Sequence, residues 1–142
     1  MSKITVEEFN ALVNAELPFA AEVGLMAESI TDGEARVRLP FRQVMIRPGG
    51  TIAGPIMMGL VDATMFAALL GRIGHVEMAV TTSLNINFLR RPPQADLVAE
   101  GRVIKAGKRL GVMEVTVYTD GDEDPVAHAT GTYSIPPKNK ES

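Results

Sequence analysis

The sequence predicts an α+β domain in which an antiparallel β-sheet wraps around one buried α-helix. The segment at about 54–71 is apolar on every face of a helix, which is expected of a helix surrounded by protein. Strand-like segments before and after it alternate apolar and polar residues with a period of two. Turns of hairpin length separate the later strands, and strands joined in this way form antiparallel sheets. The 142 residues suit a single domain spanning 1–142.

The first predicted element is a short amphipathic helix at about 5–15. Thr5 and Glu8 have the spacing of a capping box, in which each side chain accepts a hydrogen bond from the other residue's backbone N–H. The apolar residues of this segment recur with helical spacing: Val6, Phe9, Leu12 and Val13. The helix is expected to end before Pro18, because the residue before a proline disfavours the helical conformation.

Two strands are predicted before the central helix and four after it. The first two form a hairpin from Phe19 to Phe41, and residues 42–53 form a loop. A turn at Gly107 separates two of the later strands. Small residues on the last strand would let the helix approach closely: Ala127, Ala129 and Gly131. The tail at about 137–142 is predicted to be disordered.

The composition argues against several classes of function. No Cys is present, which excludes disulfides and thiol nucleophiles and is compatible with a cytoplasmic location. His75 and His128 are too few and too scattered for the usual zinc centres, so no metal is expected. The net charge of -3 gives no basic field that would attract nucleic acid. The N-terminus is acidic and lacks the apolar core of a secretory signal.

Residues 52–70 form an apolar run that is about long enough to cross a membrane. The run contains Gly54, Pro55 and Gly59, and the carboxylate of Asp62 lies near its centre. A charged group at the middle of a bilayer is costly, and the strands that follow need a soluble core. We therefore predict that this run is the buried helix and that the protein has no membrane partner.

Asp62 is the only ionisable residue between Arg47 and Arg72. Charged residues are almost never fully buried without a partner. Thr64 or Thr51 could supply a hydrogen bond, whereas no basic residue lies within a helical turn of the carboxylate. The carboxylate therefore serves either the structure alone or a chemical function.

Several motifs of the chain resemble those of one enzyme family. GTIAGPIMMGLVDAT, at residues 50–64, resembles the signature that opens the central helix in the phenylacetate-pathway (PaaI-like) type of acyl-CoA thioesterase. LNINFLRRP, at residues 84–92, resembles that family's strand ending in a Leu-Arg-Pro motif. KAGKRL, at residues 105–110, resembles the hairpin after the next strand. The resemblance covers roughly residues 17–136.

This resemblance implies a hotdog fold and the hydrolysis of acyl-CoA thioesters, with coenzyme A as part of the substrate and no separate cofactor. Asp62 matches the family's acid, which either attacks the thioester carbonyl or acts as a general base on water. Gly54 matches the residue whose N–H forms the oxyanion hole. Ala53, Pro55 and Arg47 stand where the family has His, Gly and often Asn.

Gly54 is expected at the start of the central helix, where free N–H groups and the helix dipole favour a developing negative charge. Pro55 has no N–H, so Gly54 and Ala53 are the candidate donors. Gly54 and Asp62 are about 12 Å apart along a helix, too far for one carbonyl carbon to lie about 3 Å from both. We therefore predict a homodimer in which Gly54 of one chain meets Asp62 of the other. The resemblance implies the same arrangement and a homotetramer built from such dimers.

Further residues are candidates for binding the substrate. Small or polar candidates lie on the helix, before it and on the following strand: Ala53, Thr51, Thr64, Thr81, Thr82 and Asn87. Basic candidates for the coenzyme A phosphates lie at a strand end and in the next hairpin: Arg90, Arg91, Lys105, Lys108 and Arg109. Solvent-exposed strand and turn positions would explain the same residue types.

Two other functions stay open. A non-catalytic acyl-CoA-binding protein of the same fold would fit the missing family His. A hotdog dehydratase or hydratase would use a His with an acid near the helix, and no His precedes or lies within this helix. The sequence indicates neither the acyl group nor whether its carrier is coenzyme A or an acyl carrier protein.

Overall fold

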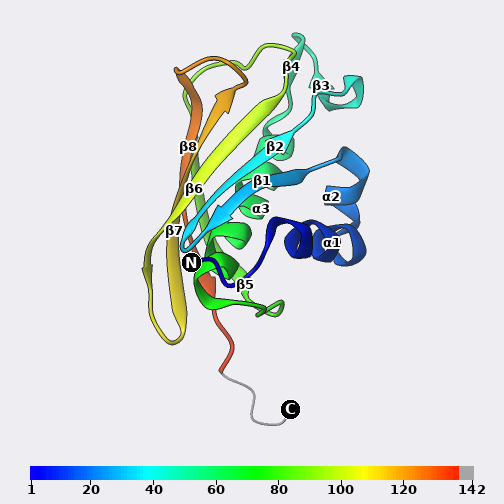
Figure 1. Ribbon diagram of the computed structural model, residues 1–142. Coiled ribbons are helices and arrows are strands. Elements are labelled where there is room, and N and C mark those ends of the chain that lie inside the picture. Colours follow the sequence, from blue (N-terminus) through cyan, green and yellow to red (C-terminus); the bar gives the residue numbers. More distant parts are fainter. Residues whose placement is uncertain (138–142) are drawn as a thin grey trace.

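The computed structural model describes residues 1–137 and confirms the predicted α+β fold, in which one antiparallel sheet curves around a single long helix, α3 (Gly54–Ile73) (Figure 1). Six strands form the sheet in the order β1-β2-β6-β7-β8-β5. Their bounds are β1 (Met26–Thr31), β2 (Glu34–Leu39), β5 (Val80–Phe88), β6 (Leu97–Ala106), β7 (Leu110–Thr119) and β8 (Pro125–Ser134). The tail expected at about 137–142 lies, beyond residue 137, outside the described residues.

The helix α3 is the central element of the core. It has 20 residues, 12 of which are buried. Pro55 stands in its first turn, where a missing N–H costs the helix no hydrogen bond, and Gly74 follows its last residue with a φ of 92°. By length and composition α3 could span a membrane, but its burial inside the protein is that of a core helix.

Glycines on the sheet let α3 pack closely against it. A Cβ atom at Gly131 of β8 would lie 2.7 Å from Sδ of Met65. At Gly101 of β6 it would lie 2.9 Å from Cγ2 of Thr64. Side chains at these positions would push the helix away from the sheet, because protein interiors are close-packed. The expectation that Gly131 lets the helix approach is therefore confirmed.

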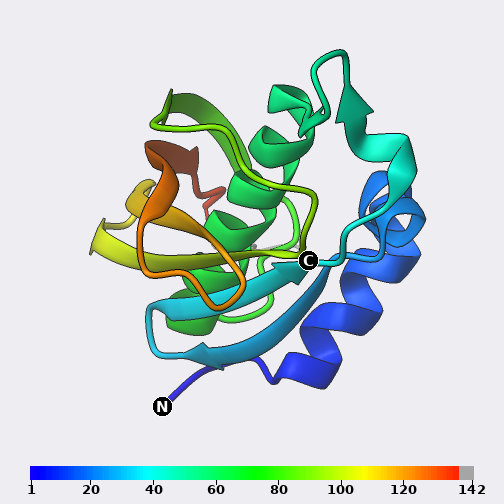
Figure 2. The ribbon, with the colours of Figure 1, turned by 90° about the horizontal axis from the view of Figure 1, so that it is seen from above.

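Two N-terminal helices lie on the other side of α3 from the sheet (Figure 2). The helix α1 (Val6–Glu16) begins with the predicted capping box. The Glu8 N–H donates to Oγ1 of Thr5 over 3.0 Å, and the Thr5 N–H donates to Oε1 of Glu8 over 2.9 Å. The ring of Phe9 lies 6.0 Å from the ring of Phe66, which joins α1 to α3.

The helix α2 (Pro18–Val23) corrects the prediction of a hairpin that starts at Phe19. Pro18 occupies the first turn, and Gly24 ends the helix with a φ of 77°, so both residues favour a short helix here. The hairpin itself consists of β1 and β2. The loop predicted for 42–53 contains the 3-10 turn η1 (Gln43–Met45) and the short strands β3 (Ile46–Arg47) and β4 (Thr51–Ile52).

Strand β5 forms one edge of the sheet and pairs with β8 alone among the described strands. Thr81 lies opposite Tyr133 at one end of this pair, and Phe88 lies opposite Ala127 at the other. The apolar residues of β5 are not fully covered, and Phe88 keeps 49% of its surface exposed. An unpaired edge with apolar side chains is a surface that favours pairing with another chain.

Candidate active site

Two hydroxyl groups hold the carboxylate of Asp62, which lies half-buried on α3. Oγ1 of Thr81, on β5, donates to Oδ1 of Asp62 over 2.7 Å. The hydroxyl of Tyr133, on β8, lies 2.7 Å from the same Oδ1 and 3.1 Å from the backbone oxygen of Asp62. Within residues 1–137, Oδ2 of Asp62 accepts no hydrogen bond. One carboxylate oxygen is therefore fixed while the other is available to react.

The expectation that Thr64 or Thr51 supplies the partner of Asp62 was wrong. Oγ1 of Thr64 donates to the carbonyl of Leu60 over 2.7 Å and is buried inside the core. Oγ1 of Thr51 donates to the carbonyl of Pro92 over 3.1 Å. Both hydroxyls satisfy backbone carbonyls, and for Thr64 the acceptor is the residue one helical turn earlier, a common partner of Thr within a helix.

Tyr133 is a site residue that the sequence did not reveal. Its side chain is 3% exposed, and its ring lies 6.1 Å from the ring of Phe66 in a stacked arrangement. Burial, and then the negative charge of Asp62, raise the pKa of Tyr133 far above its ordinary value. The hydroxyl therefore stays protonated at neutral pH and can donate to the carboxylate.

A hollow of ≈ 470 Å³ opens beside Asp62. Thr81 and Tyr133 line it together with Asp62, and Glu77 adds one more polar side chain. Most of its walls are apolar, including Leu17, Phe19, Ala20, Leu25, Phe66 and Val80. Apolar walls with a few convergent polar groups are typical of a small-molecule site.

The start of α3 offers one free N–H group, and it belongs to Gly54. The Ala53 N–H donates to the carbonyl of Met45 over 2.9 Å, so the expectation that Ala53 is a second donor was wrong. Pro55 has no N–H. The N–H groups of Ile56 and Met57 both donate to the carbonyl of Ala53. The Gly54 N–H has no acceptor among the described residues, which leaves it available for an anion.

Gly54 does not share a hollow with Asp62 in one chain. It lines a separate hollow of ≈ 410 Å³ that is also lined by Arg47, Phe88, Arg90 and Arg91. The Arg90 guanidinium donates to a carboxylate oxygen of Asp122 over 2.7 Å, whereas Arg47 and Arg91 have no such partner within residues 1–137. This second hollow therefore combines a free N–H with positive charge.

Two polar residues predicted on β5 lie away from the carboxylate. Oγ1 of Thr82 donates to the carbonyl of Thr132 over 3.1 Å. Asn87 lies opposite His128 in the pairing of β5 with β8. Neither Thr82 nor Asn87 lines the hollow beside Asp62.

The predicted basic residues are divided between the two ends of the sheet. Lys105, Lys108 and Arg109 are exposed at the hairpin between β6 and β7. This hairpin lies at the Thr81 end of β5, because Leu110 and Val80 both lie opposite Ser134. Arg90 and Arg91 follow the other end of β5. A single basic cluster within one chain is therefore excluded.

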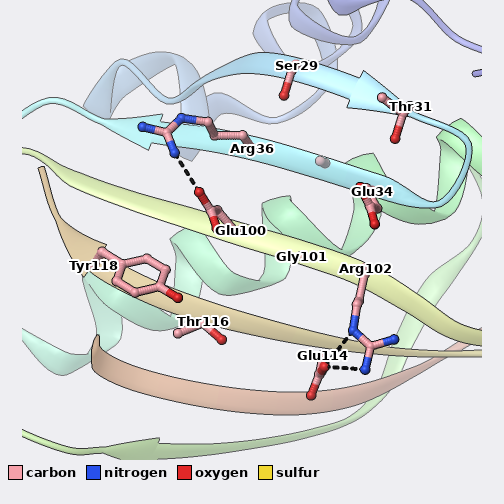
Figure 3. A pocket seen from close by; sticks show the side chains of 11 residues that line it. Ser29, Thr31, Glu34, Arg36, Glu100, Gly101, Arg102, Glu114, Thr116 and Tyr118 are labelled. Carbon is pink, nitrogen blue, oxygen red and sulfur yellow. Dashed lines mark hydrogen bonds and ion pairs between the residues drawn. The ribbon is translucent and has the colours of Figure 1, made fainter. Parts of the chain in front are cut away.

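The sheet face that points away from α3 carries paired charges around a hollow of ≈ 430 Å³ (Figure 3). Arg36 donates to Glu100 over 2.6 Å, and Arg102 donates to Glu114 over 2.7 Å. His128, 3.2 Å from Glu114, and Arg102 hold the pKa of Glu114 below its ordinary value. These charges neutralise one another, unlike the single carboxylate of Asp62. Among the described residues, no three His, Asp or Glu side chains gather as metal ligands.

A long helix inside a curved antiparallel sheet is the hotdog fold. The thioesterase superfamily model matches residues 49–126, which include both Gly54 and Asp62. The chain belongs to the thioesterase superfamily.

Individual proteins that are similar to this chain support the same family assignment. A candidate esterase of Saccharolobus solfataricus is 32% identical and covers 93% of this chain and 86% of its own. The crystal structure of a candidate thioesterase from a Silicibacter species superposes with a TM-score of 0.86 at 33% identity, covering 96% of this chain and 95% of its own. The phenylacetic acid degradation protein PaaI from Thermus thermophilus, solved as a mutant, has a TM-score of 0.75 at 25% identity over 84% and 99% of the two chains.

Proposed function

We propose that this protein hydrolyses acyl-CoA thioesters and that Asp62 is the reacting acid. The observation that carries this proposal is the position of its carboxylate: Thr81 and Tyr133 hold Oδ1, Oδ2 accepts no hydrogen bond within residues 1–137, and Asp62 lines an apolar hollow. An apolar acyl group would occupy the hollow and present its thioester carbonyl to the free oxygen. Membership of the thioesterase superfamily supports the reaction class.

Two routes fit this arrangement. In the first, Oδ2 of Asp62 attacks the carbonyl carbon, the C–S bond breaks, the thiolate of coenzyme A leaves and takes up a proton, and water then cleaves the mixed anhydride. In the second, Asp62 takes a proton from water, the hydroxide attacks the carbonyl carbon, and the proton passes to the departing sulfur. A single turnover in water labelled with heavy oxygen tests the first route. Attack of water on the Asp62 carbon of the anhydride puts the label into Asp62 and an unlabelled oxygen of Asp62 into the product acid, and the second route does neither.

The oxyanion formed on either route needs a donor, and we infer that Gly54 of a second chain supplies it. Helix α3 and strand β5 run past each other in opposite directions, so Gly54 lies beside Phe88 and Asp62 lies beside Thr81. A two-fold axis through the middle of both elements would bring Gly54 of one chain to Asp62 of the other. Met58, midway between them on α3, is 40% exposed and would lie at this axis.

The same two-fold axis would reunite the basic residues. Arg47 and Arg91 line the hollow of Gly54, while Lys105, Lys108 and Arg109 lie at the Thr81 end of the sheet. The second chain would bring its Gly54 end to the Thr81 end of the first. The phosphates of coenzyme A would then meet positive charge from both chains on the side of the site opposite the acyl hollow.

The test uses purified protein, a panel of acyl-CoAs and a thiol reagent that detects released coenzyme A. Asp62→Asn and Asp62→Ala should lower kcat about a hundredfold to ten-thousandfold. Asp32→Asn, an exposed carboxylate paired with Arg72 at the other end of α3 from Gly54, is the matched control and should keep full activity. Binding of acyl-CoA without release of coenzyme A by the wild type would favour a non-catalytic acyl-CoA-binding protein instead. Full activity of both Asp62 variants would remove Asp62 from the mechanism.

A further inference from the structure

We propose that Phe19, seated against Gly59 of α3, forms the wall that limits the length of the acyl group. This inference rests on the proposed function, because it assigns the hollow beside Asp62 to the acyl group. The contact is close: a Cβ atom at Gly59 would lie 2.5 Å from Cε2 and 2.8 Å from Cζ of Phe19. Only a glycine at this position leaves room for the ring.

Gly59 places this contact next to the reacting carboxylate. Residues three apart on a helix share a face, so Gly59 lies one turn before Asp62 on the same side of α3. Both residues and Phe19 line the hollow of ≈ 470 Å³. The ring of Phe19 therefore bounds the space into which an acyl group bound at Asp62 extends.

Phe19 differs from the other aromatic walls of the hollow in its exposure. Phe66 and Tyr133 are 8% and 3% exposed and pack within the core. Phe19 is 45% exposed and belongs to α2, a helix of six residues. A half-exposed ring on a short helix can be removed with little effect on the core, whereas the deep walls cannot.

The remaining walls near Phe19 are small or aliphatic. Ala20 and Leu25 are buried and continue the apolar surface of the hollow beside the ring. Removal of the Phe19 ring would therefore extend the hollow along an apolar path rather than open a polar one. The chemical class that such a path accepts is a longer unbranched acyl chain.

The test compares wild type, Phe19→Ala, Gly59→Ala and the double variant on a series of saturated acyl-CoAs from butyryl to myristoyl. Phe19→Ala should raise kcat/KM for long chains relative to short ones by about tenfold or more. Gly59→Ala should also change the chain-length profile, since its methyl group displaces the ring. In the Phe19→Ala background the methyl group meets no ring, so Gly59→Ala should have no further effect. Leu110→Ala, an exposed apolar residue outside the hollow, is the control and should leave the profile unchanged.

The same series is also measured by calorimetric binding to the Asp62→Asn variant, which reports chain-length preference without turnover. Two results would overturn the role of Phe19 while leaving hydrolysis by Asp62 intact. In the first, Phe19→Ala changes activity and binding equally for all chain lengths. In the second, Gly59→Ala alters the chain-length profile as strongly in the Phe19→Ala variant as in the wild type. Absence of hydrolysis in the wild type together with a Phe19-dependent binding profile would instead overturn the proposed reaction alone. No binding of any acyl-CoA would overturn both.

Discussion

The hydroxyl oxygen of Tyr133 lies 2.7 Å from Oδ1 of Asp62, although 71 positions separate the two residues in the chain. Thr81 donates to the same oxygen from the neighbouring strand. Because both donors meet one oxygen, the carboxylate is held in a single orientation, and Oδ2 is left without a donor among residues 1–137. In the proposed reaction, Tyr133 would therefore be a positioning residue that acts through Asp62.

Tyr133→Phe removes this hydroxyl but keeps the ring that stacks on Phe66. We expect kcat to fall about tenfold to a hundredfold with little change in KM, because a hydrogen bond to a charged group contributes about 1.5–3 kcal/mol. Steady-state kinetics measure the change in kcat and KM, and a melting curve measures any change in stability. Tyr118→Phe, the other tyrosine and a half-buried residue of the opposite sheet face, should change neither. An unchanged kcat in Tyr133→Phe would show that the hydrogen bond only supports the fold.

If each active site is shared between two chains, mixing two inactive variants should restore hydrolysis. Gly54→Pro removes the free N–H and suits the first position of α3, where the preceding Ala53 is already extended. The Gly54→Pro and Asp62→Asn variants are dissociated and mixed. In each mixed dimer one site then has both defects and the other site has none. Random mixing in equal amounts should restore about a quarter of wild-type activity.

The control for this mixture is Gly54→Ala, which keeps the N–H and places its Cβ at an ordinary 3.4 Å from the ring of Phe88. It should be much more active than Gly54→Pro. Mixtures that stay inactive, although mixed dimers are detected by mass spectrometry, would place both groups of each site in one chain.

We expect the Met58 side chains of the two chains to lie against each other at the two-fold axis. Met58→Glu would place two like charges together, so we expect the dimer to dissociate and hydrolysis to be lost with it. Met78→Glu is the matched control, since Met78 is 74% exposed and lies in the loop before β5. Sedimentation velocity and the hydrolysis assay are read together. A fully active monomer of Met58→Glu would contradict the shared site.

Thr119, at the end of β7, is 6% exposed, and its Oγ1 is a buried polar atom with no hydrogen-bond partner within residues 1–137. Thr119→Val replaces this hydroxyl by a methyl group of similar size and should raise the free energy of unfolding by about 1 kcal/mol. Urea unfolding measures the change. Thr116→Val, on the same strand but facing away from α3, should give a smaller gain or none.

The fold was predictable because its signals are local. The apolar residues of α3 cover every face of the helix, and the strands alternate with a period of two, so each element is visible in its own segment. The helix α2 was missed because it is only six residues long and its apolar residues also fit a strand. Pro18 and Gly24 were the available signals for it.

The candidate site was predictable only in part, because its contacts are not local. Asp62 and Gly54 stand out within their own segment, by charge and by position before a proline. The hydroxyls that hold Asp62 come from β5 and β8, and the register between these strands decides which residues face the carboxylate. For the same reason Thr64, close to Asp62 in sequence, was wrong as its partner, whereas Thr81 lies beside it.

The start of α3 has a consequence for how a substrate must be oriented. Pro55 lacks an N–H, and the Ala53 N–H donates to the carbonyl of Met45. In the proposed reaction a carbonyl oxygen would therefore meet one donor from the described residues at this helix start, Gly54. Two donors would fix the plane of the thioester, whereas a single donor leaves it free to rotate about the N–H···O axis. The shape of the acyl group against its walls must then set the angle at which the carbonyl faces Asp62. In this chain, fit of the acyl group and speed of reaction are thus expected to vary together from one substrate to the next.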